Sequence, residues 1–282
     1  MFWRRVVEDF GRDLRLASRN LWRAPAFAAA AIATLAIGIA GTTVMFALVH
    51  GVLLRPLPVH DQDRLIVAWK ELRKPDLAHY SFGDVDVERV ARDSGLLLTV
   101  AGVSSHGTSQ STIVVRGEPV HVMAAPVTGR FFDVLGVRPL IGRTLDADDD
   151  VEGAERVLVL SHGVWQRHYG GAPDVIGRQI TLDESPFTIV GVMPRELDFP
   201  AGVEVWRTTR SFSTRGAFGD AARGEVDLVA RLQPGVTIEQ ATSELAALIR
   251  HYEADAPPAE TRGLTPVVRP LAERVVGNVR PV

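Results

Sequence analysis

One uncharged stretch near the amino terminus constrains this chain more than any other feature. Between Arg23 and Arg55 lie thirty-one consecutive residues without Asp, Glu, Lys or Arg, and His50 is their only titratable side chain. A bilayer core of about 30 Å needs about 20 helical residues at roughly 1.5 Å each. The stretch therefore predicts a transmembrane helix over 25–54, in contact with the lipid bilayer. A buried core helix is the alternative, but such helices seldom run this long without a charge.

A cleaved signal peptide is a second alternative for the same stretch. The apolar part of a signal peptide usually has about 7–15 residues and follows a short basic start. Here 23 residues precede it, including Glu8, Asp9 and Asp13, and no convincing A-x-A cleavage site follows before Arg55. We expect an uncleaved membrane anchor.

The flanking charges set the orientation of that anchor. The first 24 residues carry three acidic residues and six arginines: Arg4, Arg5, Arg12, Arg15, Arg19 and Arg23. Positive flanks stay on the cytoplasmic side, so the amino terminus is expected inside and the large remainder outside. Apolar residues at helical spacing (Phe2, Val6, Phe10, Leu14) favour an interfacial amphipathic helix over 1–24, although a merely charged flank would also fit.

Small residues recur four apart within the span. The pairs are Ala29/Ala33, Ala36/Ala40 and Gly38/Thr42. This spacing lets helix backbones approach closely in lipid, so we expect partner helices from other permease segments or chains.

The segment 55–282 alternates short strand-like and helix-like units without a regular βαβ repeat. We predict an α+β fold with mixed, mostly antiparallel sheets and short helices. The expected strands are Leu65–Trp69, Leu96–Val103, Thr112–Arg116, Val120–Val127, Arg156–Leu160, Arg178–Leu182, Pro186–Val192, Glu225–Leu232 and Leu264–Arg269. Helices are expected after the caps Ser81, Thr128, Ser161 and Thr237, and Ser211–Gly224 reads as a polar connection.

Several chemistries are disfavoured by the residues present. The chain has no cysteine, and a net charge of −3 argues against a nucleic-acid partner. The acidic run Asp146–Asp150 lacks the glycine and the closing carboxylate of a calcium loop, so a solvated turn is favoured. His162 and His168 are six apart, which puts their rings on opposite sides of a helix, and packing or surface roles fit better than zinc binding. His60 is assigned no chemistry.

Catalytic motifs are also missing from the sequence. There is no Gly-x-Ser-x-Gly, and the only two lysines, Lys70 and Lys74, do not follow a glycine as a phosphate-binding loop requires. We therefore predict no enzyme activity, no catalytic, metal or cofactor-binding residues and no cofactor.

The linear order of several short motifs resembles the permease subunits of MacB/FtsX-type ABC transporters, in particular orphan permeases with a MacB-like periplasmic core domain. These motifs run from the flank of the span almost to the end of the chain: Ser18–Leu21, Ala36–Ile39, Val52–Pro58, Val127–Val137, Gly142–Leu145, Val157–Trp165, Ile176–Arg178, Thr188–Pro194 and Ala230–Thr237. The likeness covers the amino-terminal part of such a permease.

The resemblance implies a non-catalytic component of an export or mechanotransmission system in the bacterial inner membrane. It would supply the first transmembrane helix and a two-lobed periplasmic domain, and a separate cytoplasmic ATPase would drive it. One lobe is expected at 59–125 and 223–270, with the other inserted at 126–222. In close relatives a second helix follows a stretch like Val276–Pro281, so a truncated product, a fragment or a split subunit is expected here.

Two other functional classes stay open. A stand-alone, membrane-tethered binding or adaptor domain would keep the fold without the helix bundle. A tethered hydrolase fits least, because no nucleophile, base and orienting group are apparent.

Overall fold

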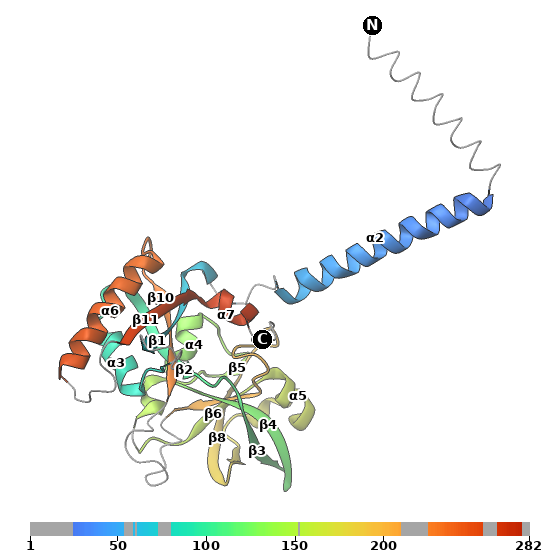
Figure 1. Ribbon diagram of the computed structural model, residues 1–282. Coiled ribbons are helices and arrows are strands. Elements are labelled where there is room, and N and C mark those ends of the chain that lie inside the picture. Colours follow the sequence, from blue (N-terminus) through green and yellow to red (C-terminus); the bar gives the residue numbers. More distant parts are fainter. Residues whose placement is uncertain are drawn as a thin grey trace. The chain divides into compact units, whose positions relative to one another are not determined.

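A computed structural model describes residues 25–53, 59, 61–72, 80–151, 153–209, 225–255 and 264–277. The chain divides into two compact units, Met1–Arg55 and Pro56–Val282. In the first unit, helix α2 (Pro25–Leu53) occupies the predicted span (Figure 1). Across the described ranges, no helix combines the length and the apolar character needed to cross a membrane. The amphipathic helix expected over 1–24 and the connection Ser211–Gly224 lie outside the described residues.

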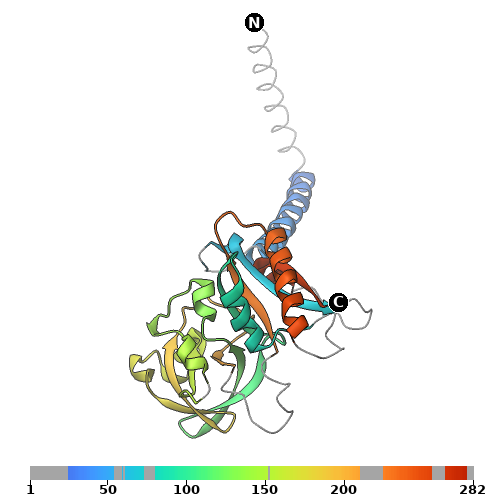
Figure 2. The same ribbon diagram turned by 90° about the vertical axis from the view of Figure 1, so that its left-hand side faces the viewer.

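The second unit contains an open, antiparallel four-stranded sheet in the order β11-β1-β10-β2. Its strands are β1 (Leu65–Leu72), β2 (Leu97–Ser104), β10 (Val226–Leu232) and β11 (Leu264–Pro270). The short helix η1 (Gln62–Arg64) precedes β1, and α7 (Leu271–Gly277) follows β11. Helices α3 (Asp84–Asp93) and α6 (Ile238–Asp255) cover one face of the sheet (Figures 1 and 2). The strand order ends at β11, which carries Pro266 and Pro270.

Six further strands close on themselves in the order β4-β3-β7-β8-β6-β9, since β9 returns to pair with β4. They are β3 (Ser109–Val115), β4 (Glu118–Val127), β6 (Val157–Leu160), β7 (Gln179–Leu182), β8 (Ser185–Val192) and β9 (Val205–Thr208). The pairs β4–β9 and β6–β8 are parallel, so the sheet is mixed. The short β5 (Ile141–Gly142) pairs with β8. We call this closed set the ring; Val103 of β2 opposite Val127 of β4 joins it to the open sheet.

Short helices fill the spaces around the ring. They are α4 (Phe131–Leu135), η2 (Ala147–Asp150), α5 (His162–Tyr169) and η3 (Pro173–Val175). Three apolar clusters result, and each follows from strand alternation. The first lies between the sheet and α3/α6, the second fills the ring and packs against α5, and the third lies between the sheet, α4 and the outer side of the ring. We call the third the shared core, because Val67 of the sheet and Trp206 of the ring both belong to it.

Two predicted helix starts are confirmed by their hydrogen bonds. The N–H of Val164 donates to Ser161 Oγ at 3.3 Å at the start of α5. At the start of α6, Thr237 N–H donates to Gln240 Oε1 at 2.9 Å and Gln240 N–H donates to Thr237 Oγ1 at 3.3 Å, which completes a capping box.

Two other predicted caps were wrong. Helix α3 begins at Asp84 rather than after Ser81, and the Asp86 carboxylate accepts from the N–H of Gly83 at 3.3 Å. The Thr128 hydroxyl does not cap α4, because it accepts from the N–H of Gly102 at 2.8 Å and so ties the ring to β2.

Strand pairing also bears on the expected lobes. β3 and β4 fall largely in the range expected for the first lobe, whereas their partners β7 and β9 fall in the range expected for the inserted one. The division into two lobes stays a prediction.

Candidate functional site

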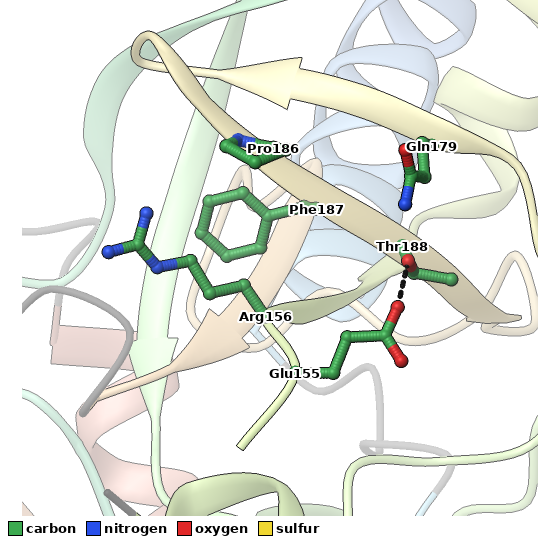
Figure 3. A pocket seen from close by; sticks show the side chains of 6 residues that line it. All are labelled: Glu155, Arg156, Gln179, Pro186, Phe187 and Thr188. Carbon is green, nitrogen blue, oxygen red and sulfur yellow. Dashed lines mark hydrogen bonds between the residues drawn. The ribbon is translucent and has the colours of Figure 1, made fainter. Parts of the chain in front are cut away.

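The larger of two hollows in the described part of the unit lies at the ring and has a volume of about 250 Å³. Its lining comes from β7, β8 and the segment before β6 (Figure 3): Glu155, Arg156, Gln179, Pro186, Phe187 and Thr188. The Thr188 hydroxyl donates to the Glu155 carboxylate, and the Thr188 N–H donates to the Arg156 carbonyl at 2.8 Å. No histidine or cysteine is among these lining residues.

The acidic turn Asp146–Asp150 is more tightly bound than the solvated turn that its sequence suggests. Both guanidinium nitrogens of Arg143 contact the Asp149 carboxylate, one at 2.8 Å, and the N–H of Asp146 donates to the same group at 2.8 Å. Burial acts to raise the pKa of Asp149, but these hydrogen bonds outweigh it and lower the pKa overall. Asp150 is buried and accepts from Gly129 N–H at 3.4 Å and Thr209 Oγ1 at 3.2 Å. The carboxylates of Asp149 and Asp150 thus accept hydrogen bonds from groups of the protein itself.

The two histidines of α5 take partly buried positions, whereas His106, His121 and His251 are exposed. His162 and His168 are both half-buried on α5, and the His162 ring lies edge-on to Trp165 with 5.7 Å between centroids. His60 lies outside the described residues. No group of three or more potential metal ligands occurs among the described residues.

Lys70 has a structural setting rather than a phosphate-binding one. Its ammonium group lies 3.2 Å from Asp86 and 4.8 Å above the Phe82 ring centroid, between β1 and the start of α3. Lys74 is outside the described residues.

The least expected side chains are two buried charges on β10. Asp227 and Arg231 both project from the face of the sheet that looks toward α4, and Asp227 is fully buried. The Arg231 guanidinium donates to the Val134 carbonyl at 2.8 and 3.1 Å and to the Asp61 carbonyl at 3.4 Å. Burial first and then the nearby Arg64 lower the pKa of Arg231, against an opposing effect of Asp61. Arg231 thereby connects β10 to α4 and to the turn that precedes β1.

Asp227 connects β10 to the helix that follows the last strand, α7. Arg274 of α7 forms an ion pair with its carboxylate. Because β10 is a central strand, the segment that enters the sheet and the segment that leaves it are both attached to one element. This arrangement suits the transmission of displacement. The two buried charges were missed from the sequence because strand alternation only places positions 227 and 231 on the face opposite the apolar one and does not show that this face is covered.

Another buried charge lies in the ring wall. Arg207 on β9 is opposite Leu158 of β6 and Pro126 of β4. Burial lowers the pKa of Arg207 to about 10, partly offset by Asp183. Its side chain is 2% exposed, so it belongs to the interior of the ring and not to a surface site.

The comparisons with known proteins agree with this architecture. The periplasmic region of MacB from Actinobacillus actinomycetemcomitans is similar in structure, with a TM-score of 0.56 and 13% sequence identity, over 78% of this chain and 94% of that one. The extracellular domain of the noncanonic ABC-type transporter YknZ from Gram-positive bacteria is also similar, with a TM-score of 0.53 and 13% identity, over 72% of this chain and 99% of that one. At such identities the likeness shows the fold. No curated protein matches the sequence.

The amino-acid sequence identifies the family. Residues 28–248, which are most of the chain, match the description "MacB-like periplasmic core domain". That segment begins within α2 and continues through the open sheet and the ring into α6. The chain therefore belongs to the family of the MacB-like periplasmic core domain, the periplasmic part of MacB/FtsX-type ABC transporter permeases.

Proposed function

We propose that this chain supplies the first transmembrane helix and the periplasmic core of an ABC-type export permease, with its amino terminus in the cytoplasm. The observation that carries the proposal is the position of the family match: it starts at residue 28, inside the uncharged stretch, and runs without a break to residue 248. The helix and the folded unit thus fall within one family segment.

The side chains of α2 support a lipid environment. Large apolar residues on several sides of this helix are strongly exposed: Ile32 at 61%, Leu35 at 64%, Ile37 at 74% and Ile39 at 61%. A helix that is apolar all round needs a protein core or a membrane around it.

The threonines of α2 also support a lipid environment. Thr34 donates its hydroxyl to Ala30 O at 2.9 Å, Thr42 to Gly38 O at 3.0 Å and Thr43 to Ile39 O at 2.7 Å. These polar groups are satisfied within the helix, as a hydrocarbon environment requires.

The chain is proposed to act without catalysis of its own. Asp149 of the acidic turn, His162 and the buried Arg231 have structural partners, and the sequence has no phosphate-binding loop. Energy would come from a separate cytoplasmic ATPase, and further permease helices would complete the bundle. The periplasmic unit would move with that bundle as a mechanotransmitter in the bacterial inner membrane.

The topology can be tested directly because the natural chain has no cysteine. Glu118→Cys, at the exposed turn between β3 and β4, should react with a membrane-impermeant maleimide in cells whose outer membrane has been permeabilised. Arg12→Cys should react only after the inner membrane is lysed, and the cysteine-free chain should not react at all. Labelling of both variants only after lysis would overturn the proposal, as would failure of the chain to sediment with membranes.

Partner association is tested separately. Gentle detergent extraction of the tagged chain should retain an ATPase and helix-bearing chains. A clean monomer under these conditions would instead support a stand-alone tethered domain.

A further inference from the structure

The carboxylate of Asp227 is in an environment that strongly favours a paired charge. It is fully buried on the central strand β10, directly opposite Val103 of β2. An ionised carboxylate in a protein interior is unfavourable unless a cation or hydrogen-bond donors compensate it. Any element that brings a cation to this position is therefore held there strongly.

Arg274 of α7 brings that cation and touches three strands or their turns at once. It forms the ion pair with Asp227 of β10, donates through Nη2 to the Ser105 carbonyl after β2 at 3.3 Å, and lies with its guanidinium carbon 5.9 Å from the Trp69 ring centroid of β1. Its side chain is 24% exposed, so most of it is buried against the sheet.

A second residue attaches the same helix. Leu271, one turn before Arg274, is fully buried in the shared core. Helix α7 is short, and these two residues are its buried contacts that the structure describes, one apolar and one charged. Arg274 also lines a hollow of about 30 Å³ whose opposite wall is the segment Phe199–Ala201 ahead of β9. The guanidinium thus lies where the open sheet, α7 and a segment leading into the ring meet.

We propose that α7 is a latch, defined by Leu271 and Arg274, that couples the segment after β11 to β10 through the buried Asp227 carboxylate. The closed state is favoured because separating Arg274 from the buried carboxylate breaks an ion pair in the protein interior, which is costly. Closed, α7 transmits displacement of the following chain to β10 and, through Arg231, to α4. Open, α7 leaves the sheet while α3, α6 and the ring keep their packing. The coupling to membrane movement rests on the proposed function, whereas the latch itself does not.

Hydrogen exchange of the full chain in detergent, read by mass spectrometry, tests the latch. Arg274→Gln should speed exchange of the α7 amides and of the turn after Ser104 at least tenfold, with no change in peptides from α6 or β6–β8. Arg274→Lys should give a smaller increase, because it keeps the charge but not the planar guanidinium contacts. Arg269→Gln, an exposed arginine on the neighbouring β11, is the matched control and should exchange like the natural chain.

A double variant separates the latch from a general loss of stability. Asp227→Asn removes the buried charge, so Arg274→Gln in that background should speed α7 exchange less than it does alone. Unchanged α7 exchange in Arg274→Gln would overturn the latch, and so would an equal increase in every peptide of the unit. Equal effects of Arg274→Gln in the two backgrounds would also overturn it. Because exchange is measured without an ATPase or transport, failure here leaves the maleimide topology result unaffected, and the reverse also holds.

Discussion

The shared core makes a quantitative prediction for Trp206→Phe. Trp206 is fully buried, donates its indole N–H to the Phe199 carbonyl at 3.1 Å, and packs edge-on against Phe132 of α4 with 5.6 Å between ring centroids. Exchanging indole for phenyl removes about 40 Å² of buried apolar surface, worth about 1 kcal/mol at roughly 25 cal/mol per Å². It also removes the partner of a carbonyl in a buried residue, which costs about 1–2 kcal/mol. The free energy of unfolding should therefore fall by about 2–3 kcal/mol.

Urea unfolding of the full chain in mild detergent measures this loss. Circular dichroism and tryptophan fluorescence should report the same midpoint, because the shared core packs residues of the open sheet against residues of the ring. Trp69→Phe is the control: Trp69 is half-buried and its indole N–H donates to the Glu71 carboxylate at 3.1 Å, which water can replace. A loss below about 0.5 kcal/mol for Trp206→Phe, or separate transitions in the two signals, would refute the reasoning.

Three further perturbations test other parts of the unit. Gly191→Ala would place a methyl group 2.0 Å from the Arg143 carbonyl oxygen and should lower the free energy of unfolding in urea by about 3 kcal/mol. Gly163→Ala on α5 is the control: its methyl group would meet nothing nearer than 3.4 Å, so the change should be neutral or stabilising. Similar losses for both variants would contradict this reasoning. Ser161→Ala removes the cap of α5 and should cost about 1 kcal/mol in the same assay, and an unchanged midpoint would count against the cap. The pKa of Asp149 is lowered in the folded state, so its stabilising contribution is complete above the unfolded pKa of about 3.9 and is lost as the pH falls through the lower folded pKa. Asp149→Asn should therefore flatten the loss of stability between pH 5 and pH 2. An unchanged dependence of the unfolding free energy on pH in this range would argue against the contribution.

Local signals predicted the elements that local interactions determine. Helix α6 was anticipated because Thr237, Gln240 and the apolar spacing that follows lie within a single helix. The two strands of the hairpin β7–β8 were anticipated as well, and the two-residue turn between them has Asp183 at φ 46° and Glu184 at φ 64°, the left-handed pair that suits such a connection. In each case the deciding contacts are a few residues apart.

Elements fixed by distant partners were harder to predict. β9 was missed because its four residues include Arg207 and Thr208, and it is a strand only through pairing with β4 and β6. The α+β fold with a mixed sheet was predicted correctly, but which strands pair in parallel was not, for the same reason. Alternation placed one side of β10 in the core correctly, but the opposite side is buried too, because α4, α7 and the turn before β1 cover Asp227 and Arg231. Charged residues in a strand are read as solvated unless the covering elements are known.

The prolines of β11 have a consequence for how these molecules behave when crowded together. The backbone N–H and carbonyl of Lys70 both bond to Tyr80, on the side of β1 away from β11. Pro266, which lies opposite Lys70 on β11, therefore has its backbone N and carbonyl directed away from β1. Because this direction alternates along a strand, the backbone of Pro270 is directed away from β1 as well. At the outer margin of the sheet both positions lack an N–H, and an incoming extended peptide would find donors missing at two places where a continuous ladder needs them. The two prolines thereby protect the sheet against edge-to-edge aggregation at this margin.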